Sequence, residues 1–454
     1  MIIKKYFNKN RLTLTLFVGL TLLSSCSEQE TQKTKVPEMT SVQVVKDITY
    51  LASDDLKGRV SFSPEIDQAG DYISQRFMEI GLSPLEGNKD FKQTFKVTSI
   101  MPNTLTVSLN GSLIAKENLG IASTISNISW KNIDEIKTHI IGEADDMRKA
   151  LGKMNHEGEQ HLVLIHSAHA KMFAGYQGYF KRGLTKLSLE HQGAIVMILV
   201  DDNEITSIDV SASTTITEKV LTNIVAVLPG TDTNVEIAKE TILYSSHYDH
   251  LGVTPDGKEI FNGADDDASG TSAVINLAQH YASKGSNNRT LMFSAFTAEE
   301  IGGFGSKYFS QQLNPDDVVA MINIEMIGKP SKFGAGTVWM TGMERSNLGE
   351  LLNASLKDKK SKIFKDPYPE QGLFYRSDNA TLARLGVPAH SFSSTQLDKD
   401  QHYHKTSDDI NSLDLDSMYK VIESLSVATQ GLVDGSITPT RIDMSKVLAK
   451  GKIY

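Results

Sequence analysis

The chain has a single cysteine, Cys26, among its 454 residues, so no disulfide bond can form within it. It also lacks an excess of positive charge, because 46 lysine and arginine residues stand against 55 aspartate and glutamate residues, a formal net charge of −9. This acidic balance argues against a nucleic-acid partner. No internal repeat is visible in the sequence. A chain of this length is expected to fold as two domains, or as one domain that carries an insertion.

The first 26 residues predict an export signal rather than a folded element. Basic residues open it, at Lys4, Lys5, Lys9 and Arg11. The apolar run that follows, 12–23, is too short and wrongly flanked for a transmembrane span. Leu23-Ser-Ser-Cys26 matches a bacterial lipoprotein signal, in which the cysteine carries the lipid. We therefore expect lipidation of Cys26, an anchor in the cell envelope at the outer membrane, facing the periplasm or the exterior, and a flexible tether over 27–40. A plain secretory signal with an incidental cysteine is the alternative.

Strands and helices alternate over most of the remaining chain. Short apolar runs are typical of buried strands, and apolar residues three or four positions apart are typical of helices. Strands are expected at 93–100, 105–109, 161–166, 193–200, 223–230, 241–246, 291–297, 318–324, 337–341 and 389–392. Helices are expected at 42–51, 64–81, 170–191, 272–281, 303–311, 346–356, 380–385 and 416–433. The alternation predicts an α/β protein with a mixed, mainly parallel central sheet and helices on both faces.

The segment 112–216 differs from its surroundings, and we interpret it as an inserted β-rich accessory domain. The main domain then comprises 41–111 and 217–435, followed by a C-terminal tail over 436–454. No acidic cluster beside a histidine in the insertion can be assembled into a site from the sequence. Its scattered histidines are therefore expected to be surface or core residues rather than ligands: His156, His161, His166, His169 and His191.

An acidic loop between a strand and a helix is the most informative stretch of the sequence. His247-Tyr-Asp249 leaves the strand 241–246, and Gly263-Ala-Asp-Asp-Asp-Ala-Ser-Gly270 leads into the helix 272–281. In an open α/β sheet, the crevice beyond the strand ends is where ligands bind. Three consecutive aspartates repel one another unless a cation neutralises them. With the imidazole of His247 they form a nitrogen and oxygen donor set suited to zinc.

Four further groups of polar residues lie at strand ends or in loops. They are Thr297-Ala-Glu299-Glu300, Asn323-Ile-Glu325, Arg376-Ser-Asp378 and the loop from Gln401 through His402, Tyr403 and His404 to Asp408. Each of these residues alone is best explained as a solvated surface residue. Because acidic residues follow one apolar strand after another, we expect the groups to meet in one crevice.

These motifs, in this order, resemble those of the co-catalytic di-zinc exopeptidases, which include bacterial leucyl-type aminopeptidases and glutamate carboxypeptidases. The resemblance covers about 41–110 and 217–435. It implies the zinc-exopeptidase fold with a protease-associated-like insertion, two zinc ions per chain, and hydrolysis of N-terminal residues from peptides. Whether the enzyme acts as an aminopeptidase or a carboxypeptidase stays open, as does its oligomeric state.

The resemblance also implies the metal ligands. His247 and Glu325 would bind the first zinc, Glu300 and His404 the second, and Asp266 would bridge the two. Position 325 is commonly aspartate in the aminopeptidases. The glutamate here is also a hard oxygen donor and preserves metal binding, but its length puts in doubt the geometry of the first metal and the site of the substrate amine.

Four other residues receive roles in the reaction. The resemblance implies that Asp249 orients His247, that Glu299 is the general base, and that Tyr403 donates to the developing oxyanion. Asp378 is expected to bind substrate.

Two other functions compete with this hypothesis: a glutaminyl cyclase, which resembles the same fold and uses one zinc, and a metal-free binding protein related to this fold. In each case the membrane is reached by the lipid anchor alone.

Overall fold

The computed structural model describes residues 36–189, 191–201, 204–356 and 361–448. The expected signal with Cys26, residues 27–35 of the expected tether and residues 449–454 of the tail lie outside this part of the chain, so those interpretations stay predictions. Within the described residues, no helix combines the length and the apolar character that crossing a membrane requires.

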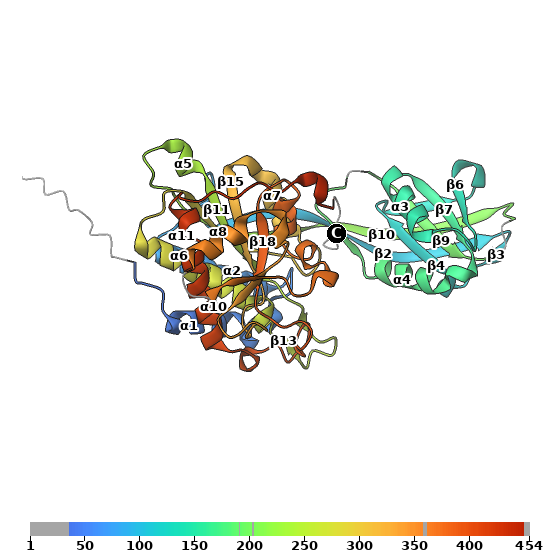
Figure 1. Cartoon of the computed structure of the whole chain (residues 1–454). Helices are drawn as coiled ribbons and strands as arrows, with labels where there is room; N and C mark the ends of the chain where they lie inside the picture. Colours follow the sequence, from blue (N-terminus) through green and yellow to red (C-terminus); the bar gives the residue numbers. More distant parts are fainter. Residues whose placement is uncertain (1–35, 190, 202–203, 357–360, 449–454) are drawn as a thin grey trace, which may run out of the picture. The chain divides into compact units, whose positions relative to one another are not determined.

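A large mixed sheet forms the centre of the fold, in the order β17-β16-β18-β15-β11-β14-β10-β2-β3 (Figure 1). The central strands β18, β15, β11 and β14 run parallel, whereas β16 and β10 join them antiparallel. The strands of this path are β2 (Lys92–Leu109), β3 (Ser112–Leu113), β10 (Ile208–Leu228), β11 (Thr241–His247), β14 (Thr290–Phe296), β15 (Val318–Ile324), β16 (Val338–Met340), β17 (Ile363–Lys365) and β18 (Ala389–Ser393). Shorter strands are β1 (Ser83–Pro84), which pairs with β10, and the pair β12 (Gly252–Val253) and β13 (Ile260–Phe261).

Helices cover both faces of this sheet, because successive side chains of a buried strand point to opposite faces. On β11, Tyr244 joins one core with α1, α2, α6 and α10, while Leu243 joins another with α7 and α9. The helices are α1 (Ser41–Leu51), α2 (Pro64–Ile80), α5 (Val235–Lys239), α6 (Gly270–Lys284), α7 (Phe304–Gln312), α8 (Leu348–Ser355), α9 (Asn379–Ala383), α10 (Leu415–Ala428) and α11 (Gln430–Val433). The expected α/β architecture with a mixed sheet is thereby confirmed.

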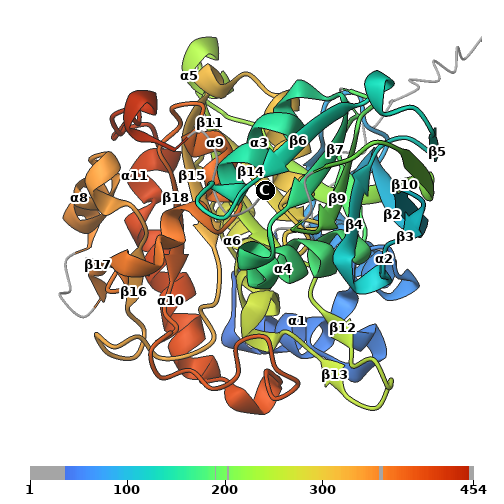
Figure 2. The same cartoon turned by 90° about the vertical axis from the view of Figure 1, so that its right-hand side faces the viewer.

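A smaller sheet, β4-β9-β7-β6, lies in the segment that the sequence marks as an insertion (Figure 2). One face packs on the helices α3 and α4, and the other packs on β5 and on parts of β2 and β10. These elements are α3 (Met147–Glu157), α4 (Ala170–Lys181), β4 (Leu119–Ser123), β5 (Asn127–Trp130), β6 (Lys137–Ile141), β7 (Gln160–Ile165), β8 (Leu184–Lys186) and β9 (Ala194–Leu199). The segment therefore contains two helices beside its strands, and the exact domain boundaries stay a prediction.

Several element bounds differ from the sequence-based expectation. The strands expected at 93–100 and 105–109 are one strand, β2, because it pairs with β10 along its whole length. A bulge between Ser213 and Thr214 takes up the extra residue of β2. The helix expected over 170–191 ends at Lys181, since the chain turns at Gly183, whose φ is +85°.

Candidate metal centre

The strand β11 carries His247 to the edge of the sheet and ends there. Every residue of β11 is buried, because the strand lies between β14 and β15. Further along, Gly263 has φ of +58°, and a Cβ at this position would lie 2.3 Å from the carbonyl oxygen of Asp266 and 2.5 Å from the ring of His250. Only glycine fits there. A π-helical turn, Ala264–Ser269, follows and leads into α6; the peptide bond between Asp266 and Asp267 within it is cis.

The three consecutive aspartates of this turn have different partners. Asp265 accepts the N–H of Gly328 at 2.8 Å and pairs with the ammonium group of Lys329 at 3.3 Å. Asp267 accepts backbone N–H groups, including that of Gly270 at 2.9 Å, and burial raises its pKa well above the usual value. Asp266 alone is turned toward imidazole groups. The repulsion that the sequence suggested is therefore relieved by the protein itself at two of the three positions.

The two oxygens of Asp266 face two different groups of side chains. In the first group, Oδ1 lies 3.2 Å from Nε2 of His247, and Glu325 completes a set whose ligand atoms all lie within 4.8 Å of one another. Desolvation raises the pKa of Glu325 to about 7. The predicted ligands His247, Asp266 and Glu325 are thus brought together.

The second group contains His250, Asp266 and Glu300, also within 4.8 Å, and His404 lies beside it. Oδ2 of Asp266 lies 3.3 Å from Nε2 of His404. Glu300 is 3.2 Å from the same nitrogen through Oε2 and 2.8 Å from Nδ1 of His250 through Oε1. The predicted pair Glu300 and His404 is therefore brought together, and His250 is an addition that the sequence analysis missed.

Buried polar atoms that lack a hydrogen bond gather at this place. Among the described residues they include Nε2 of His247 and Nε2 of His250. Such atoms are uncommon in folded proteins and call for an explanation, such as a bound ion. Imidazole nitrogens and carboxylate oxygens are the donors that zinc takes. The residues present therefore fit two divalent cations that share Asp266.

Asp249 contacts both the first motif and the loop that carries the glutamate pair. Its carboxylate accepts the backbone N–H of Glu299 at 3.0 Å and that of Glu300 at 3.3 Å. His247 donates from Nδ1 to the backbone carbonyl of Asp249 at 3.1 Å, while Oδ1 of Asp249 is 3.8 Å away. Glu299 belongs to neither metal-binding group. Desolvation raises its pKa well above the usual value, with the charge of Glu325 acting in the same direction.

Tyr403 and Asp378 border the same centre. The ring of Tyr403 stacks on that of His404 with 4.0 Å between centroids, and Nη2 of Arg376 donates to its hydroxyl at 3.5 Å. Burial and the carboxylates of Asp266 and Glu300 raise the pKa of Tyr403, so the phenol keeps its proton. Asp378 is buried, its carboxylate oxygens have no hydrogen bond, and burial raises its pKa to about 7. Its expected role in substrate binding stays a prediction.

Two residues to which the sequence analysis assigns no individual role hold the centre in place. Arg59 is fully buried and donates to the carbonyl groups of Tyr248 at 2.9 Å and Gly263 at 3.0 Å. Asp408 accepts the N–H groups of Asp265 and Asp266, each at 3.1 Å. Both residues act on backbone groups of distant loops, and such contacts leave no pattern of residue types along the chain.

Comparison with known proteins decides the family. Residues 223–429, which include every predicted metal ligand, match Peptidase family M28. This part of the chain belongs to that family. Leucine aminopeptidase 1 of Penicillium rubens is 29% identical to this chain over 206 residues, 43% of this chain and 52% of the relative. The vacuolar membrane protease of Schizosaccharomyces pombe is 23% identical over 315 residues, 68% of this chain and 34% of the relative. The chain thus spans about half the length of the leucine aminopeptidases that it matches.

Solved structures share the M28 fold over most of the chain. An aminopeptidase from Aneurinibacillus sp. strain AM-1 superposes with a TM-score of 0.53 at 19% identity, covering 92% of this chain and 98% of that one. BSAP, a zinc aminopeptidase from Bacillus subtilis, gives a TM-score of 0.53 at 14% identity, covering 92% and 99%. The family expected from the motifs and its α/β fold are both confirmed.

Proposed function

We propose that this protein is a zinc-dependent aminopeptidase that removes N-terminal residues from peptides, with two zinc ions sharing Asp266. The observation that carries the proposal is the division of the Asp266 carboxylate between two groups of imidazoles and carboxylates, 3.2 Å from His247 and 3.3 Å from His404. Membership of the M28 family supports it, as do relatives described as leucine aminopeptidases and a structural neighbour described as a zinc aminopeptidase.

The roles of the chain's own residues follow from their positions. When bound, two zinc ions polarise a carbonyl group and lower the pKa of a water molecule from about 15.7 toward 7. Glu299 takes the proton of the attacking water and returns it to the leaving amine, and its raised pKa makes the ionised carboxylate a stronger base. The hydroxyl of Tyr403 donates a hydrogen bond to the oxygen on which negative charge develops. Asp249 holds the peptide of Glu299 through a 3.0 Å hydrogen bond.

The cellular location of the protein is a separate proposal that rests on the sequence. We propose that Cys26 is lipidated and anchors the enzyme in the cell envelope, since Leu23-Ser-Ser-Cys26 follows a short apolar run. Labelling of cells with radioactive palmitate should mark the wild-type chain and leave Cys26→Ala unlabelled. Equal labelling of both chains would contradict lipidation at this residue.

Metal content per chain, measured together with hydrolysis of a leucyl chromogenic amide, tests the proposed activity. The protein to use is 27–454, which lacks the expected signal. We expect two zinc ions per M28 centre and cleavage that a chelator abolishes and zinc restores. One zinc ion, no cleavage and cyclisation of an N-terminal glutamine substrate would favour a glutaminyl cyclase. Peptide binding without metal or turnover would favour a binding protein.

A further inference from the structure

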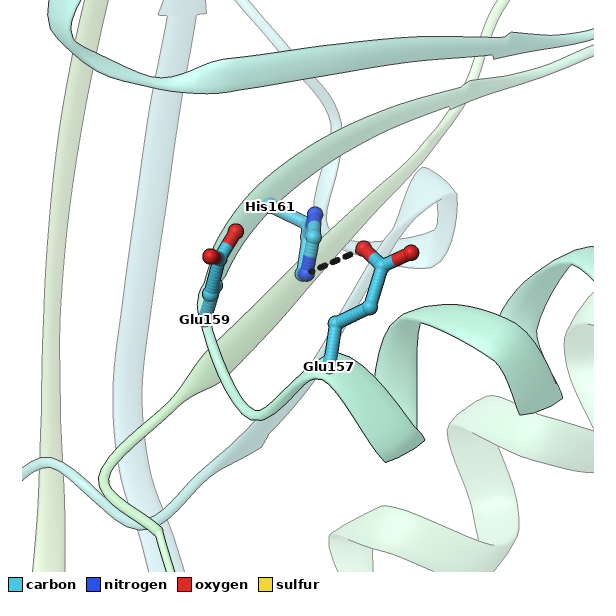
Figure 3. A group of neighbouring side chains, drawn as sticks. All are labelled: Glu157, Glu159 and His161. Atoms are coloured by element: carbon cyan, nitrogen blue, oxygen red, sulfur yellow. Dashed lines mark ion pairs between the residues drawn. The ribbon is translucent and has the colours of Figure 1, made fainter.

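A second cluster of acidic and imidazole side chains lies outside the M28 centre, in the segment that carries the smaller sheet. Glu157 is the last residue of α3, and Gly158, with φ of +65°, turns the chain from the helix toward β7. Glu159 and His161 follow at alternate positions. One ligand atom from each of Glu157, Glu159 and His161 lies within 4.8 Å of the others. Figure 3 shows the ring of His161 between the two carboxylates. The expectation that no acidic cluster in this segment lies beside a histidine is therefore wrong.

His161 presents one ring nitrogen to the cluster. The residue is fully buried, and Nδ1 lies 3.0 Å from Nε2 of His139. Nε2 has no hydrogen-bond partner, because Oε2 of Glu157 is 3.7 Å away, beyond hydrogen-bond distance. Burial, together with His139, lowers the pKa of His161, so the ring is neutral at pH 7. When Nδ1–H of His161 is the donor to His139, the lone pair of Nε2 is free to bind a cation, the arrangement usual for a histidine ligand.

The two carboxylates leave the cluster open to solvent. The side chains of Glu157 and Glu159 are 34% and 48% exposed, so an ion can reach them. Lys137 pairs with Glu159 through Oε2, which leaves the other oxygen for a second partner. Lys153 lies 3.9 Å from Oε1 of Glu157, so an exposed ammonium group accompanies each of the two carboxylates around the buried nitrogen. One nitrogen and two oxygens, with a position open to water, form a donor set of the zinc type.

We propose that Glu157, Glu159 and His161 form a divalent-cation site of the zinc class, separate from the M28 centre, that ties the end of α3 to the start of β7. A cation at this place satisfies the nitrogen of His161, which otherwise stays buried without a partner. It also competes with Lys137 for Glu159. The site has no part in peptide hydrolysis, so the proposal of this site does not depend on the proposed aminopeptidase activity.

Zinc content of matched variants tests the site. Chains 27–454 are stripped with a chelator, dialysed against buffers of fixed free zinc, and assayed for metal per chain. Glu157→Gln with Glu159→Gln should hold one zinc ion fewer than wild type, with unchanged hydrolysis of the leucyl amide. The control, Glu135→Gln with Glu143→Gln, removes two exposed glutamates of the same segment and should keep the wild-type zinc content. Equal zinc in wild type and in both double variants would overturn the proposal. Because only the difference between chains matters, the result holds whatever metal the M28 centre binds.

A second variant should change zinc binding in the opposite direction. Lys137→Gln removes the competing ammonium group, so the zinc ion assigned to the cluster should bind at several-fold lower free zinc than in wild type. Thermal unfolding of Lys137→Gln should also show a larger rise in Tm on adding zinc. An unchanged or weaker affinity would remove Glu159 from the ligand set and overturn the three-residue site.

Discussion

The carboxylate of Asp249 accepts a hydrogen bond from the backbone N–H of Glu299 at 3.0 Å, which joins the loop after β11 to the loop after β14. The orientation of His247 depends on a different part of the same residue, since its Nδ1 donates to the backbone carbonyl of Asp249 at 3.1 Å. The side chain of Asp249 therefore positions the expected general base, and its backbone positions the expected metal ligand.

Asp249→Asn should lower kcat by about 10- to 100-fold while the zinc content stays at the wild-type level. An amide has one acceptor oxygen, so it cannot accept the N–H groups of both Glu299 and Glu300 as the carboxylate does. The measurements are kcat on a leucyl amide and zinc per chain. Ser61→Ala is the control, because it removes one 3.2 Å hydrogen bond to Asp249 and leaves both backbone contacts in place. Loss of zinc in Asp249→Asn would show that the carboxylate acts on the ligands instead.

Glu299→Gln should keep all bound zinc and lower kcat by roughly 100- to 10,000-fold, the usual contribution of a general base. The reason is that Glu299 belongs to neither ligand group, whereas Glu300 lies 2.8 Å from His250 and 3.2 Å from His404. Glu300→Gln is the matched variant and should lose zinc as well as activity. Wild-type kcat in Glu299→Gln would remove the base assignment.

The sequence predicts the central strands and the motif residues well, for a physical reason. β11 and β15 are buried on both faces, so β15 is almost entirely apolar and β11 has an apolar stretch, Ile242–Tyr244. The polar residues that follow such strands meet at one edge of the sheet. The long ladder of β2 and β10 is less visible in the sequence, because its strands are partly exposed, carry many polar residues, and lie far apart along the chain, at Lys92–Leu109 and Ile208–Leu228.

Residues whose role depends on the direction of a side chain in a loop were missed. His250 follows the motif residue Asp249 directly, yet only the fold of its loop turns the ring toward Glu300. Considered alone in the sequence, His161 is best explained as an ordinary core or surface residue. Its burial and its position between Glu157 and Glu159 arise from the turn at Gly158, which residue types alone do not predict.

His250→Asn should weaken binding of one of the two M28-centre zinc ions by about 10- to 100-fold, because Nδ1 of His250 lies 2.8 Å from Oε1 of Glu300 and holds or shares that ligand. Titration of the metal-stripped protein with zinc, monitored by calorimetry, measures the affinities of the two zinc ions of the M28 centre separately. His280→Asn, on α6 and outside both ligand groups, should leave them unchanged. If both zinc ions bind His250→Asn with wild-type affinity, His250 has no part in holding the metal and only packs against Gly263.

Stability should fall in mild acid because of His390, which is buried in β18. Its Nδ1 donates to the carbonyl of Thr341 at 2.8 Å, and in the neutral ring Nε2 accepts from the hydroxyl of Ser346 at 2.9 Å. Burial lowers the pKa of His390 from 6.5 to about 4. The unfolded chain therefore takes up a proton between these pH values that the folded chain does not. The contribution of His390 to the free energy of unfolding is fully present above pH 6.5. It is lost as the pH falls toward 4, and the loss is about 3 kcal/mol at most.

His390→Asn isolates that contribution. Asparagine keeps an N–H for the carbonyl of Thr341 but does not titrate, so its free energy of unfolding should decline less between pH 7 and pH 4 than that of wild type. Urea unfolding in the presence of a chelator measures both curves without a contribution from acid release of metal. Ser346→Ala keeps the imidazole and should retain the wild-type slope, even though its stability at pH 7 is lower. Parallel curves for wild type and His390→Asn would mean that the ring is protonated in the folded state as well, because only an equal uptake of protons by both states removes the slope.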